Sequence, residues 1–353
     1  MNEKIPFRLP TIESTANASL EVRLRYKIDH KTKPLGALGL LEDLALQLGL
    51  IQRSESPLLH SPQMVVFAAD HGIAAEGVSA YPQAVTVQMV GNMLAGGAAI
   101  NVFARQHGFA LQVVDAGVAA NLPAHPQLLP RKIAMGTKNL CKQPAMSRDQ
   151  AQAALTAGME VMQALPGNVV AFGEMGIANT SPAALLLARL TGASIEEATG
   201  RGTGLDDRQL LHKQGVLMGA LACHPATQPL DVVGELAALG GFEIAMMAGA
   251  MLQAASERRV VLVDGFIAGA AALVAQALAP QVRGYLVFCH RSAETGHRLL
   301  LAHLEAQPLL ELDLRLGEGT GALLAWPLVQ SAANFLNEMA SFESAGVSGK
   351  EGA

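Results

Sequence analysis

VVAFGEMGIANTSPAALLLARL, residues 169–190, joins an apolar run, a loop that contains glycine and a second apolar run with helical periodicity. The first run is rich in β-branched residues and ends at Glu174, as a buried strand would. The polar residues at 179–181 come directly before Pro182, which is the usual signature of a helix start. A strand, a short loop and a helix in this order predict one unit of a parallel sheet flanked by helices.

Three other segments repeat the apolar run that ends in an acid close to a glycine. They are MVVFAAD through Asp70, QVVDAG through Asp115 and RVVLVD through Asp264. The Ala- and Leu-rich stretches expected to be helices are residues 84–106, 147–165, 182–190 and 242–255. Alternating strands and helices predict an α/β fold, in which the acids meet beyond the carboxyl ends of the strands.

Composition favours a compact globular protein that does not bind nucleic acid. Half of the 353 residues are hydrophobic, only 16% are charged and the net charge is -5, whereas a phosphate-backbone binder carries a basic surplus. Cys141, Cys223 and Cys289 form no CxxC pair and indicate reduced thiols. Residues 1–14 show no secretory signal, so a cytoplasmic location is expected. The apolar run 265–280 is shorter than the roughly 20 residues of a membrane span and predicts a buried helix.

Glu318 lies between Gly317 and Gly319 in RLGEGTGA, residues 315–322. Glycine weakens a helix or strand by about 1 kcal/mol, so this run indicates a tight turn or a backbone that a ligand approaches closely. We interpret Glu318 as the place of the chemistry. A surface turn with a solvated acid is the alternative.

Two segments could hold a phosphate group. The helix that starts near Pro182 offers free backbone N–H groups beside glycines, and TGRGTGLDD at 199–207 is followed by Lys213. Neither segment matches the P-loop or the dinucleotide fingerprint. An ordinary capped helix and a solvated lysine are the alternatives.

The segment from His71 to Val90 carries polar groups suited to one flat heteroaromatic ring, at Ser79, Tyr81 and Gln88. His290 and His297 are seven residues apart with no third ligand nearby, so we expect them to be structural and predict no metal site.

Together the segments resemble the nicotinate-nucleotide:dimethylbenzimidazole phosphoribosyltransferases over nearly the whole chain. The motifs that carry the resemblance are TKPLGALGLLEDLA at 32–45, ADHGIAAEGVSAYPQAVT at 69–86, GEMGIANTSPAAL at 173–185, GRGTGLDD at 200–207, GGFEIAMMAGAML at 240–252, VLVDGFIAGAAAL at 261–273 and RLGEGTGALLA at 315–325. Leu35, Ala37 and Leu40 depart from the proline, serine and arginine common in the family, which puts a polar role of that segment in doubt. Ala178 replaces a frequent glycine, and its small size is expected to be harmless.

The resemblance implies a cytoplasmic homodimer that transfers 5-phosphoribose from nicotinate mononucleotide to 5,6-dimethylbenzimidazole, in the assembly of the cobalamin nucleotide loop. It implies a Rossmann-like large domain of residues 61–303 and a small helical domain of residues 1–60 plus 304–353. It implies no cofactor and no metal, and it puts Glu318 at the position of the catalytic base. The substrate-binding residues that we expect are Ser79, Tyr81, Gln88, Glu174, Gly176, Asn179, Thr180, Gly202, Thr203, Gly204, Lys213, Asp264, Gly265 and Leu316.

The residues fit this chemistry, because the incoming azole must lose an N–H proton and one placed carboxylate can accept it. A transferase that uses phosphoribosyl pyrophosphate is a weaker alternative, since VVLVDGFIAG offers one acid after its strand where such enzymes have a pair. From a different class, the chain could be a non-catalytic sensor or carrier of a benzimidazole-like base or its nucleotide. The presence of Glu318 argues against that alternative.

Overall fold

The computed structural model describes residues 7–227 and 229–348. Within them lies one parallel sheet with the strand order β3-β2-β1-β4-β5-β6. The strands are β1 (Gln63–Ala69), β2 (Ala110–Gly117), β3 (Leu128–Pro130), β4 (Val169–Met175), β5 (Val260–Val263) and β6 (Leu286–Phe288). This is the strand order of doubly wound dinucleotide-binding folds, so the predicted Rossmann-like α/β class is confirmed.

The four predicted strands are the central ones, β1, β2, β4 and β5. Strand β1 pairs on one side with β2, Gln63 against Ala110, and on the other with β4, Gln63 against Val170. The sequence reverses direction across the sheet between β1 and β4, which makes this the topological switch point. The edge strands β3 and β6 were not predicted, because three residues are too few to show a periodic pattern.

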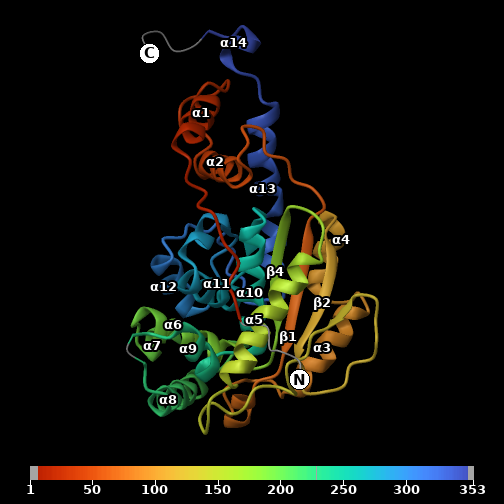
Figure 1. The fold of residues 1–353 in the computed structure, drawn as a ribbon, viewed down its shortest axis with the longest axis vertical. Helices are drawn as coiled ribbons and strands as arrows, with labels where there is room; N and C mark the ends of the chain where they lie inside the picture. The colour runs from red at the N-terminus through yellow and green to blue at the C-terminus, as the bar shows by residue number, and fades with distance from the viewer. Residues whose placement is uncertain (1–6, 228, 349–353) are drawn as a thin grey trace.

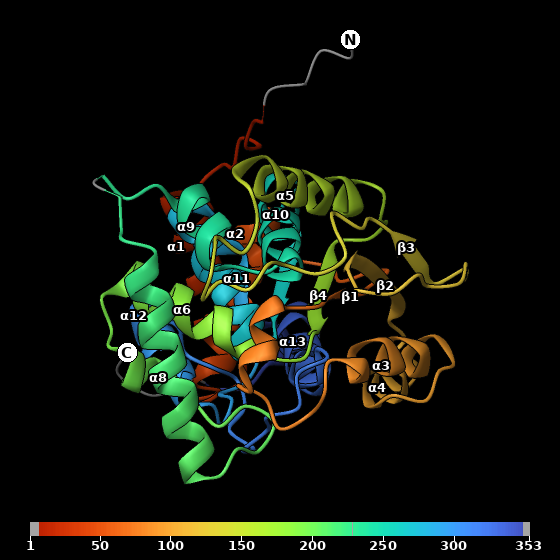
Figure 2. The same ribbon diagram turned by 90° about the horizontal axis from the view of Figure 1, so that it is seen from below.

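Helices cover both faces of the sheet (Figure 2). On one face α5 (Arg148–Gln163) packs on α10 (Phe242–Ser256), and on the other lie α3 (Ala84–Leu94), α4 (Ala99–His107) and α13 (Thr320–Glu338). Helices α5 and α10 approach so closely that a Cβ atom at Gly158 would stand 1.9 Å from the carbonyl oxygen of Met246. The helices expected at 147–165, 182–190, 242–255 and 265–280 are confirmed as α5, α6 (Thr180–Thr191), α10 and α11 (Phe266–Leu278).

The single helix expected over residues 84–106 is wrong. Helix α3 ends at Leu94 and α4 begins at Ala99, with Gly96 between them in the left-handed region at φ +80°. By length and hydropathy alone, residues 84–107 are the one candidate membrane span among the described residues. The break leaves two shorter helices packed on the sheet, and Asn101 in the first turn of α4 donates a hydrogen bond to the carbonyl oxygen of Met93 near the end of α3 at 2.9 Å.

The first two helices of the chain and the last two come together at one end of the molecule. Helices α1 (Ala18–Asp29), α2 (Leu40–Gln52) and α14 (Phe342–Ala345) gather around the far end of α13 (Figure 1), where Lys31 pairs with Ser341. The division into residues 1–60 plus 304–353 and residues 61–303 stays a prediction, and residues 1–6 and 349–353 lie outside the described residues. The remaining helices are η1 (Gly72–Glu76), α7 (Ile195–Ala198), α8 (Asp207–Cys223), α9 (Val232–Leu239), η2 (Pro280–Tyr285) and α12 (Thr295–His303).

Candidate active site

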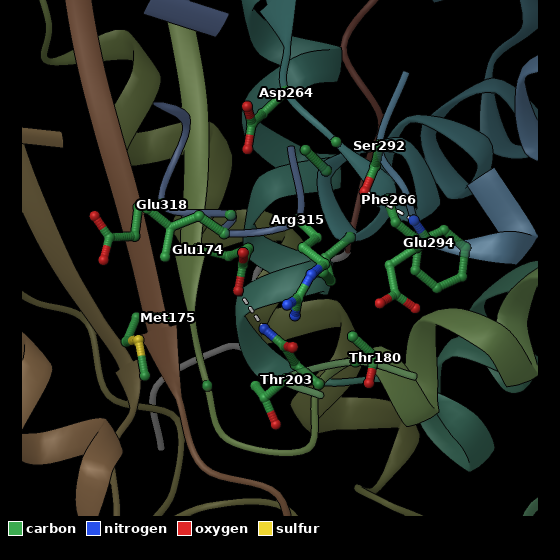
Figure 3. Close-up of a pocket in the computed structure, with 18 of the residues that line it drawn as sticks. Glu174, Met175, Thr180, Thr203, Asp264, Phe266, Ser292, Glu294, Arg315 and Glu318 are labelled. Atoms are coloured by element: carbon green, nitrogen blue, oxygen red, sulfur yellow. Dashed lines mark hydrogen bonds between the residues drawn. The ribbon is translucent and has the colours of Figure 1, made fainter. Parts of the chain in front are cut away.

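A cavity of about 360 Å³ opens beyond the carboxyl ends of β4, β5 and β6 (Figure 3). The loops after these strands supply most of its wall, through Glu174, Asp264 and Ser292. The loop at 202–203 and the turn at 315–318 close it on the remaining sides. The cavity therefore lies where a doubly wound sheet places its ligand, and its volume is that of a small-molecule site.

Glu318 occupies a turn that the backbone fixes. Gly317, Glu318 and Gly319 all have positive φ, at +81°, +64° and +92°. For a residue with a side chain this conformation costs about 1 kcal/mol or more, so the surrounding structure must hold Glu318 in it. The turn rests directly on β4, since a Cβ atom at Gly173 would stand 2.1 Å from the carbonyl oxygen of Glu318.

Asp264, at the end of β5, fastens the same turn from the other side. Its Oδ2 accepts a hydrogen bond from the Gly319 N–H at 3.2 Å, and its Oδ1 accepts one from the Ala322 N–H at 3.1 Å. These are among the first N–H groups of α13, which find no partner within the helix itself. His290 Nε2 lies 3.4 Å from Asp264 Oδ1. Asp264 thus lines the cavity, but both of its carboxylate oxygens accept hydrogen bonds from the backbone that carries Glu318.

Glu318 is buried, with 4% of the residue's surface exposed. Burial raises its pKa, a hydrogen bond from the Ile100 N–H to Oε2 at 3.2 Å opposes the rise, and the charge of Asp264 adds to it. Ile100 lies in the first turn of α4, where the helix dipole also favours an anion. Glu318 is therefore a carboxylate with a pKa above its ordinary value that still has one donor to steady its charge.

Glu174 is the second carboxyl group of the cavity. Burial raises its pKa to about 8, against a hydrogen bond that Asn179 Nδ2 donates to its Oε2 and a backbone hydrogen bond with Glu318. Gly317 leaves room for it, because a Cβ atom there would stand 2.2 Å from Glu174 Oε1. At neutral pH Glu174 is mainly protonated, so the two carboxyl groups of the site differ in their readiness to accept a proton.

The opposite part of the cavity is suited to an anion. Thr180 at the start of α6, Gly202 and Thr203 line it. Lys213, from α8, is fully buried behind this wall and donates a hydrogen bond from Nζ to Thr180 Oγ1 at 2.7 Å. Burial lowers the pKa of Lys213 to about 8, and the charge of Glu294 opposes the shift. The charge of Lys213 therefore acts on this part of the cavity from behind Thr180 and the glycine loop.

Comparison with known proteins identifies the family. A family model described as phosphoribosyltransferase matches residues 14–347. The chain belongs to this phosphoribosyltransferase family. It is an enzyme of the pentosyltransferase class.

Its relatives match more than nine tenths of the chain. A nicotinate-nucleotide–dimethylbenzimidazole phosphoribosyltransferase of Cupriavidus taiwanensis is 64% identical over 329 residues, which is 92% of this chain and 94% of that protein. The enzyme of the same name from Variovorax paradoxus is 58% identical over 97% of this chain and 98% of its own. The crystal structure of CobT from Thermus thermophilus superposes with a TM-score of 0.91 at 45% identity, over 94% of this chain and all of that one.

The structure brings most of the expected site residues of this phosphoribosyltransferase to one cavity. Those that line it are Tyr81, Glu174, Gly176, Asn179, Thr180, Gly202, Thr203, Asp264, Gly265, Leu316 and Glu318. Four others do not line it in the described chain, namely Ser79, Gln88, Gly204 and Lys213. Gln88 is exposed on α3, and the Ser79 hydroxyl accepts a hydrogen bond from the Tyr81 N–H at 3.4 Å.

Sequence reasoning missed several residues of the phosphoribosyltransferase cavity. Met175, Ser292, Glu294 and Arg315 line it without having been predicted. Ser292 and Glu294 lie in the loop after β6, a few residues beyond its end at Phe288, whereas Asp264 directly follows β5. The signal was the acid after a short apolar run, LVFCHRSAE, but the run was too short to stand out as a strand.

Ala178, His290 and His297 are the remaining residues of the phosphoribosyltransferase for which an expectation follows from the sequence. Ala178 has a φ of +74°, in the left-handed region that glycine adopts more easily, and this conformation costs the chain about 1 kcal/mol. His290 and His297 have ring centres 6.2 Å apart, and His297 Nδ1 accepts a hydrogen bond from the Ser292 N–H at 2.8 Å. Burial lowers the pKa of His297 to about 3, so it is neutral. Within the described residues no three metal-ligating side chains form a group.

Proposed function

We propose that this chain transfers 5-phosphoribose from nicotinate mononucleotide to 5,6-dimethylbenzimidazole, giving α-ribazole 5′-phosphate and nicotinate for the nucleotide loop of cobalamin. The observation that carries the proposal is Glu318, a buried carboxylate with a raised pKa held at the wall of the cavity. The names of the Cupriavidus taiwanensis and Variovorax paradoxus proteins, which are 64% and 58% identical over 92% and 97% of this chain, support the choice of substrates.

The cavity offers a different environment for each substrate. Tyr81, Val85, Met89 and Met175 form an apolar part that suits the flat azole ring. Thr180, Gly202 and Thr203, at the start of α6 and in front of Lys213, suit the phosphate of the donor. The ribose would lie between these two parts, with its anomeric carbon on the side of Glu318.

The chemistry needs one proton acceptor. The glycosidic bond from C1′ to the pyridinium nitrogen breaks, and its electron pair neutralises the ring, so the ring nitrogen needs no acid. A nitrogen lone pair of the azole forms the new bond to C1′, and the N–H proton of the azole passes to Glu318. Glu174 is already protonated at neutral pH because burial raises its pKa to about 8. It is therefore suited to steady the turn, and Glu318 is left as the base.

The test is to incubate the purified protein with nicotinate mononucleotide and 5,6-dimethylbenzimidazole and to follow both products by chromatography with mass detection. We expect turnover in the wild type and a loss of roughly 100- to 10,000-fold in Glu318→Gln, with substrate affinities little changed. Glu311→Gln is the matched control, because Glu311 is exposed and pairs with Arg291 outside the cavity. Near-normal turnover of Glu318→Gln would refute the base, whereas binding of azoles without any product in the wild type would favour a sensor or carrier.

We further propose that the enzyme works as a cytoplasmic homodimer, with residues 1–60 plus 304–353 as its small helical domain. Helix α8 exposes Leu211 and Met218, seven residues apart on one side, which gives a second copy an apolar strip to cover. Cys141, Cys223 and Cys289 are all free thiols, as is common in a reducing compartment. Light scattering on the purified protein measures the oligomeric state, and a monomer at micromolar concentration would contradict the dimer.

A further inference from the structure

Glu294 is a buried carboxylate that takes no part in the proposed transfer reaction. It directly precedes α12 and lines the cavity, and 7% of its surface is exposed. Its Oε2 has no hydrogen-bond partner among the described residues. In Figure 3 Glu294 and Glu318 stand on opposite sides of Glu174 and Arg315. A desolvated carboxylate oxygen without a partner is costly, and because Oε2 itself has almost no accessible surface, the carboxylate must turn for this oxygen to meet a donor on a ligand in the cavity.

The loop around Glu294 is shaped to hold it. A Cβ atom at Gly200 would stand 2.0 Å from Glu294 Oε2, so only glycine leaves room for the carboxylate there. Burial raises the pKa of Glu294, while the charges of Lys213 and Arg315 and the backbone N–H of Gly202 lower it. These three groups favour the anion, and the two cations also offset its repulsion of a phosphate bound nearby.

The donor nucleotide and the azole offer few groups that could satisfy this oxygen. Phosphate and the nicotinate carboxylate present only acceptor oxygens at neutral pH, and an anion would repel them. The azole has one N–H group, and the proposed mechanism directs it to Glu318. The remaining donors are the 2′- and 3′-hydroxyls of the ribose, and a carboxylate is a common partner for ribose hydroxyls in nucleotide sites.

We propose that Glu294 binds the ribose hydroxyls of the donor and makes the enzyme select ribonucleotides over deoxyribonucleotides. This inference rests on the proposed function, because it takes its ligand from that reaction. A site built to bind a hydroxyl rejects the analogue that lacks it, since its own buried polar group is then left unpaired. Glu294 is accordingly a specificity-determining residue at the wall that faces away from the base.

The test compares nicotinate mononucleotide with its 2′-deoxy and 3′-deoxy analogues as donors, by kcat/KM and by calorimetric affinity. We expect the wild type to prefer the ribonucleotide by about 100-fold or more over at least one analogue, and Glu294→Gln to reduce that preference at least about tenfold. Glu294→Asp, which keeps the charge but retracts it, should fall between the two. Glu311→Gln should behave as the wild type.

An unchanged preference in a folded Glu294→Gln protein, with melting behaviour like that of the wild type, would overturn the inference. A wild type that accepts deoxyribonucleotides equally well would overturn it too. The proposed function is judged separately, because it requires product from the ribonucleotide and dimethylbenzimidazole in the wild type. If no product forms, the calorimetric preference for the ribonucleotide still tests Glu294 by itself.

Discussion

Asp264 Oδ2 accepts a hydrogen bond from the backbone N–H of Gly319, the residue directly after Glu318, at 3.2 Å. Its Oδ1 accepts a second one from Ala322 at 3.1 Å. The end of β5 thereby holds the turn that presents the proposed base, although 55 residues separate the two segments. The side chain acts on Glu318 in two ways, through the backbone that it fastens and through its charge.

Asp264→Asn should therefore change both the rate and the pH profile. An asparagine accepts with one oxygen only and turns an N–H donor toward the other backbone N–H, so the turn loosens and turnover falls by about 10- to 100-fold. Because the charge of Asp264 raises the pKa of Glu318, its removal should move the acid limb of the kcat/KM profile to lower pH. Steady-state rates between pH 4.5 and 9 measure both effects.

Asp115→Asn is the control for a general loss of stability. Asp115 is buried at the end of β2, where its Oδ1 accepts a hydrogen bond from the Val118 N–H at 3.0 Å, outside the cavity. Its replacement should cost stability but leave the acid limb in place. If the acid limb and turnover of Asp264→Asn match those of the wild type, Asp264 does not position Glu318.

The four central strands of the sheet could be predicted from the sequence. Strands β1, β2, β4 and β5 could be predicted because each is an apolar run followed by an acid, and a strand buried on both faces needs such a run. The break between α3 and α4 was missed, although Gly96 and Gly97 marked it, because the apolar pattern continues on both sides. The continuous apolar pattern therefore indicated one helix, although the two glycines indicated a break.

A site residue could be predicted where one segment holds both the reactive side chain and the glycines that shape its backbone. Glu318 stood out because Gly317 and Gly319 flank it, and both have the positive φ that glycine allows. Glu294 was missed because it follows the short edge strand β6 and because its neighbours, Gly200 and Lys213, are about 80 to 95 positions away. Contacts of that kind depend on tertiary packing, which no local pattern encodes.

Glu174→Gln should flatten the dependence of stability on pH. Burial raises the pKa of Glu174 from 4.5 to about 8, so the folded state keeps a proton that the unfolded state loses between these values. The stability that this proton contributes is complete below pH 4.5 and is lost as the pH rises to 8 and beyond. Relative to Glu174→Gln, the wild type should lose on the order of 4 kcal/mol between pH 5 and pH 9.

Urea unfolding at a series of pH values measures this difference. Glu311→Gln, at an exposed glutamate, should follow the wild type. At pH 7 Glu174→Gln should keep more activity than Glu174→Ala, because glutamine is neutral like the protonated acid and can still accept the hydrogen bond from Asn179. Parallel stability profiles for the wild type and Glu174→Gln would show that Glu174 is ionised in the folded protein.

Lys213→Met should weaken binding of the donor and remove one pH dependence. Lys213 donates to Thr180 Oγ1 from behind the proposed phosphate site, and burial lowers its pKa to about 8. The wild type should bind nicotinate mononucleotide less tightly as the pH rises through 8, because the amine then loses its charge. The variant should bind about 10- to 100-fold more weakly at pH 7 and lack this step. Lys142→Met, at an exposed lysine outside the cavity, should leave affinity unchanged. Calorimetric titration from pH 6.5 to 9.5 measures the affinity for nicotinate mononucleotide. Equal affinity in Lys213→Met and the wild type over this whole range would show that the phosphate binds elsewhere.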